Sequence, residues 1–195
     1  MRNFILSLTI FILAAMAMGS PGYAQSEEPA QSEELAQSEE LDRLFEELAA
    51  ADDTSWQAIE QNIWREWSKS GSPAMDLLLK RGRSAMQAGD WALAIEHLTA
   101  LTDHAPDFAE GWNARATAYF QAGLYGPSIA DIEKTLALNP RHFGAMSGLA
   151  RILEEIGYPK EALEMYRNVV AIHPFRPDIN TAIERLEKDV GGTDL

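Results

Sequence analysis

Histidines are present in this chain, but their spacing does not form a recognisable metal or catalytic site. The four histidines, His97, His104, His142 and His173, never stand three or four positions apart. Two histidines on one helix face need that spacing to bind a single metal ion. We therefore interpret all four as structural or surface residues and expect no bound metal.

Acidic residues are numerous, and the adjacent pair Glu154 and Glu155 is the most suggestive of acid–base catalysis. Neighbouring residues on a helix point about 100° apart, so these two carboxylates do not face one substrate atom together. No serine stands in a nucleophile elbow, no glycine-rich loop is suited to phosphate, and the chain has no cysteine. The sequence predicts a protein that is not an enzyme and needs no cofactor.

The strongest pattern in the sequence is a 34-residue period that would have to position any binding residues. Three glycines and three prolines keep this interval: Gly89, Gly123 and Gly157, and Pro106, Pro140 and Pro174. A glycine can close one helix with a positive φ angle, and a proline cannot continue the next. A fixed period of this length predicts a solenoid of helix–turn–helix units.

The units at 75–108, 109–142 and 143–176 resemble tetratricopeptide repeats. Small residues stand where that family brings the two helices of a unit together, pairing Gly82 with Ala94, Ala116 with Ser128, and Ala150 with Ala162. Each unit also ends in the proline that the family places there. The resemblance implies an all-α, right-handed solenoid, although Ala85 is small where the family usually has a bulky residue.

The segments on both sides of the three units are interpreted as caps. Residues 41–72 carry apolar residues at helical spacing and predict a degenerate N-terminal helix pair that caps the stack. Residues 177–190 predict a C-terminal capping helix with one apolar face. Trp64 lies off the apolar face of the early pair, so it is either a wedge against the first regular unit or an exposed contact residue.

The N-terminus resembles an export signal. Arg2 precedes an apolar run, and Gly22, Tyr23 and Ala24 end in small residues that suit cleavage after Ala24. We therefore expect residues 1–24 to be a signal peptide, with retention as a membrane anchor as the alternative. Cleavage predicts a periplasmic protein with no stable membrane insertion, and secretion into the medium is the second destination considered.

Residues 25–40 repeat a short acidic motif and predict a disordered acidic linker, since dense negative charge opposes collapse. The interpretation leaves open whether this linker is a solvated spacer or an acidic docking tail. The net charge of the whole chain is −14. Such a charge argues against nucleic acid as a partner, because phosphate binding needs a basic surface.

The resemblance implies that the first helix of each unit lines a concave groove, which is the candidate binding site. Its candidate residues are Leu79, Arg83, Met86 and Gln87 in the first unit, Asn113, Thr117, Phe120 and Gln121 in the second, and Ser147, Arg151 and Glu154 in the third. The alternative is that these side chains form only a solvated face. The lysine and asparagine clamp by which one subfamily binds chaperone C-termini is absent.

These observations favour a protein–protein interaction module of the cell envelope that binds a protein or peptide segment in its groove. Two alternatives remain. One is a structural envelope-assembly factor that uses its convex face or self-association. The other is an accessory of a peptidoglycan-active complex, which would need an exposed aromatic surface.

Overall fold

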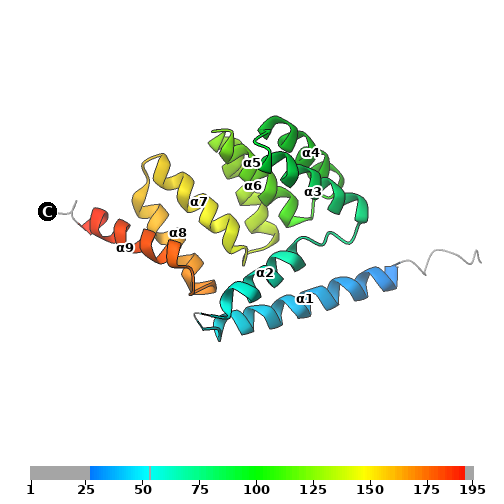
Figure 1. Cartoon of the computed structure of the whole chain (residues 1–195), viewed down its shortest axis with the longest axis horizontal. Helices are drawn as coiled ribbons and strands as arrows, with labels where there is room; N and C mark the ends of the chain where they lie inside the picture. Colours follow the sequence, from blue (N-terminus) through cyan, green and yellow to red (C-terminus); the bar gives the residue numbers. More distant parts are fainter. Residues whose placement is uncertain (1–26, 53, 192–195) are drawn as a thin grey trace, which may run out of the picture.

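The computed structural model describes residues 27–52 and 54–191, and the predicted signal peptide therefore lies outside the described residues. The described part contains nine helices and no strand (Figure 1). The helices are α1 (Glu27–Ala49), α2 (Trp56–Trp67), α3 (Pro73–Gln87), α4 (Trp91–His104), α5 (Ala109–Gln121), α6 (Tyr125–Leu138), α7 (Phe143–Glu155), α8 (Pro159–Ile172) and α9 (Pro177–Gly191). None of them is long and apolar enough to cross a membrane.

Helices α3 to α8 form three successive antiparallel pairs, α3 with α4, α5 with α6 and α7 with α8 (Figure 1). The turn within each pair contains a glycine with positive φ, at 76° for Gly89, 74° for Gly123 and 88° for Gly157. This conformation is strained for residues that carry a Cβ atom, which explains why glycine marks the period. The predicted all-α repeat fold is confirmed.

Small residues allow the helices of a pair to approach closely. A Cβ atom added to Gly82 would lie 2.5 Å from Cγ of Leu98 on α4, so a larger residue does not fit. In the second pair, the buried Ser128 hydroxyl donates a 2.8 Å hydrogen bond to the backbone carbonyl of Ala116. These contacts occur at the small-residue positions on which the family resemblance rests.

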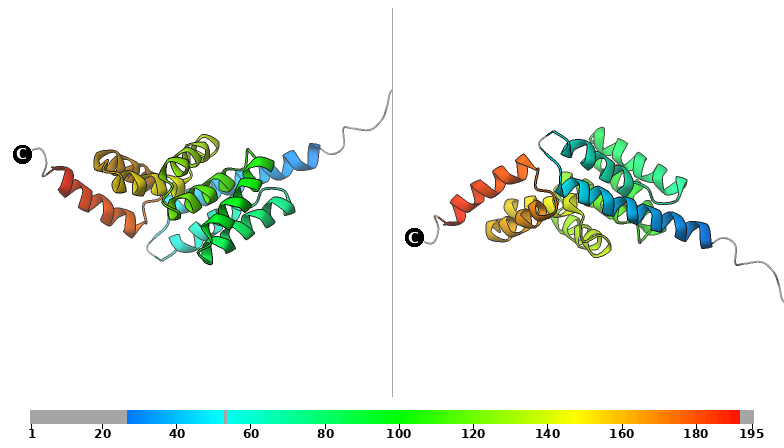
Figure 2. Two further views of the ribbon diagram at one scale, coloured as in Figure 1. Left: turned by 90° about the horizontal axis from the view of Figure 1, so that it is seen from above. Right: turned by 90° about the horizontal axis from the view of Figure 1, so that it is seen from below.

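We expected the N-terminal helix pair to cap the stack. Instead, it lies across the repeats and packs against the third unit (Figure 2). Phe45 of α1 and Trp67 of α2 share a core with Phe143, at ring-centroid distances of 6.5 and 4.9 Å. Trp64 packs on the same end of α7, with its ring centroid 5.5 Å from that of Phe143. Trp64 fits there because Gly144 has no side chain to exclude its ring.

The prediction of a disordered linker over residues 25–40 is wrong for its described part, because α1 begins at Glu27. Glutamate, alanine, leucine and glutamine are good helix formers, and their propensity favours extending the helix that continues to Ala49. Tertiary contact also supports this helix from Gln37 onward, where the side-chain amide donates to the carbonyl oxygens of Glu66 (2.6 Å) and Lys69 (3.3 Å).

Candidate functional site

A cleft of about 280 Å³ lies between α5, α7, Trp64 of α2 and the start of α9, and we call it the Trp64 cleft. Six of the residues proposed from the sequence line it: Asn113, Thr117, Phe120, Gln121, Ser147 and Arg151. The first helices of the second and third pairs therefore place their candidate residues around one cavity, with α2 as an additional wall.

Two glycines on one face of α7 shape the cleft. A Cβ atom at Gly144 would lie 2.9 Å from Cζ2 of Trp64, so the indole ring rests directly on this glycine. At Gly148, one turn further along, the nearest atom to an added Cβ would be Cδ1 of Ile132 at 3.6 Å. Gly144 thus seats Trp64, whereas Gly148 leaves open space beside it.

Aromatic rings and one arginine form the rim of the Trp64 cleft. Phe120 stacks on Tyr125 with their ring centroids 5.8 Å apart, and the guanidinium of Arg151 lies 5.0 Å from the centre of the Phe120 ring. Arg151 is exposed, and no carboxylate in the described part of the chain forms an ion pair with it. Its guanidinium donors are therefore available to a ligand.

The second arginine of the cleft is already paired. Arg176 donates to both carboxylate oxygens of Asp178, at 3.0 and 2.8 Å, and to Glu60 of α2 at 3.3 Å. The bond to Asp178, and secondarily the charges of Asp178 and Glu60, raise the pKa of Arg176, so its charge is held in place. Arg176 therefore fixes α2 against the start of α9 rather than adding a second free cation.

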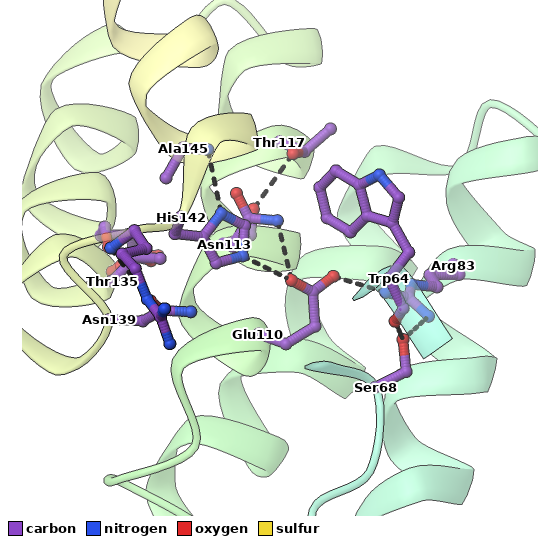
Figure 3. A network of polar contacts seen from close by, with 12 residues as sticks. Trp64, Ser68, Arg83, Glu110, Asn113, Thr117, Thr135, Asn139, His142 and Ala145 are labelled. Atoms are coloured by element: carbon purple, nitrogen blue, oxygen red, sulfur yellow. Dashed lines mark hydrogen bonds and ion pairs between the residues drawn. The ribbon is translucent and has the colours of Figure 1, made fainter. Parts of the chain in front are cut away.

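A buried polar network lies beside the cleft and joins the repeats to α2 (Figure 3). The Glu110 carboxylate accepts hydrogen bonds from Arg83, from the Asn113 amide at 3.0 Å and from Nε2 of His142 at 3.0 Å. His142 takes this tautomer because its Nδ1 accepts from the backbone N–H of Ala145 at 3.1 Å. Because the network is buried and its groups pair with one another, we assign it a structural role.

The structure corrects the groove assignment of residues in the first unit. Leu79 is only 2% exposed and packs in the core between α3, α4 and α5, so it cannot contact a partner. Met86 is partly buried against the same core. Arg83 lies under α2, where its guanidinium donates to Glu110 and to the Ser68 hydroxyl. The position of α2 explains the engagement of Arg83, whereas Leu79 and Met86 are buried by the packing of α3 against α4 and α5.

The remaining candidates lie away from the cleft or are engaged elsewhere. Gln87 is exposed at the last residue of α3 and does not line the cleft. Glu154 accepts a 2.7 Å hydrogen bond from the Tyr166 hydroxyl and pairs with Arg185 of α9. Asn113 does line the cleft, but it is 9% exposed and its amide is held by Glu110.

Several cleft residues are absent from the sequence-based selection, among them Trp64, Gly148 and Ile179. Gly148 was detectable in principle, because a glycine inside an amphipathic helix lowers helix stability and calls for a reason. Trp64 was interpreted either as a wedge against the first unit or as an exposed contact residue; in the structure it wedges against the third unit.

A larger and more open depression of about 1290 Å³ lies between α1, the end of α2 and the turns that follow α4 and α6. Arg141 partly bridges it, since its guanidinium pairs with Asp42 at 2.6 Å and lies 4.4 Å from the centre of the Phe45 ring. Among the described residues, no group of histidine or acidic side chains is arranged to hold a metal ion. None of the candidate binding residues lines this depression, whereas six line the Trp64 cleft, so we take the Trp64 cleft as the candidate binding site.

Comparisons with known proteins identify the repeats. The sequence model described as "Tetratricopeptide repeat" matches residues 79–129. A TPR repeat-containing protein of Rhizobium etli is 34% identical over 152 residues, which are 77% of this chain and 74% of that protein. The small glutamine-rich tetratricopeptide repeat-containing protein 2 of Saccharomyces cerevisiae is 29% identical over 131 residues, which are 67% of this chain and 36% of that protein.

Solved structures show the same fold. The first TPR of Spaghetti (RPAP3), bound to an HSP90 peptide, superposes with a TM-score of 0.58 at 20% sequence identity. The match covers 60% of this chain and 93% of that one.

Proposed function

We propose a protein-binding role for this chain, which belongs to the tetratricopeptide repeat family: a segment of a partner protein binds in the Trp64 cleft. The observation that carries this proposal is the convergence of Phe120, Arg151 and Trp64 on one cavity. Arginine and large aromatic side chains dominate the energetics of protein interfaces when they surround a pocket. Here they come from three helices that the repeats and α2 hold in place.

The relatives support the same class of function. The TPR domain of Spaghetti is bound to a peptide of HSP90, so a surface built from such repeats binds a peptide in that protein. In this chain the Trp64 cleft lies between the first helices of two successive pairs, α5 and α7. Trp64 of α2 adds a wall to this cleft, so its partner need not be the one that the Spaghetti domain binds.

We further propose that the chain acts in the cell envelope, as a periplasmic protein. The support is the signal-like segment of residues 1–24. The partner is then an exported or membrane-anchored protein with a segment in the same compartment. Mass spectrometry of the exported chain tests this part, with Gln25 expected as its first residue.

Site-specific photocrosslinking tests the binding site. A photoreactive phenylalanine analogue at Gln121, which is exposed at the cleft, is expected to capture a discrete partner in living cells. The matched control places the same analogue at Glu133, an exposed residue on α6 that does not line the cleft. Capture from Glu133 alone would show that the cleft is not the site and would favour the envelope-assembly alternative.

A further inference from the structure

We propose that the Trp64 cleft binds an extended acidic segment, with one apolar side chain above Gly148 and an adjacent carboxylate on Arg151. The inference rests on the proposed function and names the chemistry of the partner. It follows from three features of the described residues: an unfilled hollow, one available arginine and the space that α2 already occupies.

The hollow at Gly148 suits an apolar side chain. Gly148 lies inside α7, where glycine costs about 1 kcal/mol of helix stability relative to alanine. Packing does not require this glycine, because an added Cβ would meet only Ile132, at an ordinary contact distance of 3.6 Å. Ile152, Ile179 and the Trp64 ring also line the space, so most of its wall is apolar. An aliphatic or aromatic side chain of the partner would fill it.

The carboxylate site is Arg151. An arginine presents several N–H donors in a planar fork that matches a carboxylate, and an aromatic face helps to orient it. Arg151 has this orientation over Phe120, at 5.0 Å, and no ion-pair partner among the described residues. The other arginine of the cleft, Arg176, is neutralised by Asp178 and Glu60. Of these two arginines, Arg151 is therefore the one whose donors can pair with a carboxylate of the ligand.

The shape of the cleft favours an extended segment over a helix. Helix α2 already lies along the concave side. Near its start, Glu60 accepts a hydrogen bond from Arg176, and just after its end, Ser68 accepts one from Arg83. Because α2 covers this part of the concave side, the room left for a ligand is the cleft beside Trp64. An extended chain needs less room, and its backbone can bond to exposed polar groups such as Thr117 and Gln121.

Short capped peptides test this chemistry on the purified chain. The probe is Ac-Ala-Leu-Asp-Ala-amide, and its matched control has asparagine in place of aspartate. Binding is followed by the amide signal of Gly148 and the indole signal of Trp64 in NMR titrations. We expect both signals to shift with the acidic peptide and the asparagine peptide to bind about tenfold more weakly, since a hydrogen bond to a charged group is lost.

Two variants separate the two halves of the proposed site. Arg151→Gln is expected to remove the preference for the acidic peptide, whereas Arg81→Gln, on exposed α3 surface outside the cleft, leaves it unchanged. Gly148→Leu is expected to weaken both peptides at least about tenfold by filling the hollow, without lowering the Tm, because leucine is the better helix former. If Gly148→Leu loses binding and also has a lower Tm, the titration is repeated with Gly148→Ala. The proposal then requires that Gly148→Ala still weakens the binding of both peptides.

The possible failures are distinguishable. Equal binding of the two peptides, or a preference that survives in Arg151→Gln, overturns the carboxylate site. Absence of any shift at Gly148 and Trp64 overturns the extended-segment proposal. In either case the proposed function stands if crosslinking at Gln121 captures a partner, and it fails only if that capture fails as well.

Discussion

Gly144 and Gly148 are one turn apart on α7, and replacing them is expected to have opposite effects on stability. Gly144→Ala forces a Cβ atom into the Trp64 ring, so we expect the free energy of unfolding to fall by about 1–3 kcal/mol. Gly148→Ala meets no such contact and is expected to raise it by up to about 1 kcal/mol through helix propensity. Urea unfolding of both variants makes the comparison, and equal effects would mean that Trp64 does not rest on Gly144.

Among the charged residues, Glu110 is the one whose replacement is expected to lower the free energy of unfolding most. Its side chain is 3% exposed and accepts hydrogen bonds from Arg83, Asn113 and His142. Removing one member of a buried charged network leaves its partners unpaired, which commonly costs about 3–5 kcal/mol. Glu110→Ala should therefore lose at least about 3 kcal/mol in chemical denaturation, whereas Glu133→Ala on the exposed face of α6 should change little. A loss below about 1 kcal/mol would contradict a structural role for the network.

His173 makes stability depend on pH in a predictable direction. Its ring is buried, and neither ring nitrogen has a hydrogen-bond partner among the described residues. Burial, and secondarily the charge of Arg176, lowers the pKa of His173 to about 4 from its ordinary value of 6.5. Between these two pH values the unfolded chain therefore binds more protons than the folded one, and the free energy of unfolding decreases as the pH falls.

The expected loss from His173 is on the order of 3 kcal/mol between pH 6.5 and pH 4, with no further loss from this group below pH 4. Urea unfolding at several pH values measures it, and His173→Leu supplies the comparison. The difference between the parent chain and the variant should change across this interval and be constant above it. A difference that does not vary with pH would show that His173 is not the group responsible.

At the scale of single helices, the first part of α1 is expected to be dispensable for folding. Leu35 in this part is 62% exposed, whereas Gln37, further along, donates a hydrogen bond to the backbone carbonyl of Glu66. Deleting residues 25–35 should therefore shift the Tm by no more than about 2 °C.

A longer deletion through residue 48 provides the control for this prediction. It removes Leu44 and Leu48, which are at most 1% exposed, and should lower the Tm by far more than the short deletion. Thermal unfolding followed by circular dichroism distinguishes the two cases. A large decrease for the short deletion would mean that the first turns of α1 pack on the body.

The sequence was sufficient for the repeat helices because the signals that form them are local. Gly89 closes α3 through its own positive φ angle, and the Asp90 side chain then caps α4 by accepting from the backbone N–H of Leu93. Small residues such as Gly82 report contacts within one unit. These signals lie within a few tens of residues and repeat three times, so the period makes them visible.

The placement of the N-terminal pair could not be predicted in the same way, because its contacts join distant parts of the chain. Asp42 and Arg141, which form an ion pair across this interface, are separated by 99 positions. Apolar spacing in α2 showed that Ile63 and Trp67 are buried, but not which surface buries them. The prediction for Leu79 failed for a similar reason. The resemblance to the family implied a position in the groove, whereas its actual neighbours are core residues of the first and second units.

At the scale of the whole molecule, α2 changes how the repeats depend on one another. In a simple solenoid each unit contacts only its neighbours, so stability is a sum of local terms. Here α2 contacts α3 through Ser68 and Arg83, α7 through Trp64 and Gly144, and the start of α9 through Glu60 and Arg176. The first and third units are thus linked through α2, which should make the described body unfold as one cooperative unit.

Equilibrium unfolding in urea tests this coupling with two probes. Tryptophan fluorescence reports mainly on α2 and the first two pairs, which contain all five tryptophans, and far-ultraviolet circular dichroism reports on every helix. For the parent chain we expect the two transitions to coincide, as two-state unfolding requires. Trp67→Ala should separate them, because it removes the ring that stacks on His142 at 4.2 Å and packs on Phe143. The exposed Gln57→Ala substitution on the same helix should leave them coincident. Separate transitions in the parent chain would show that the repeats unfold independently and that α2 does not couple them.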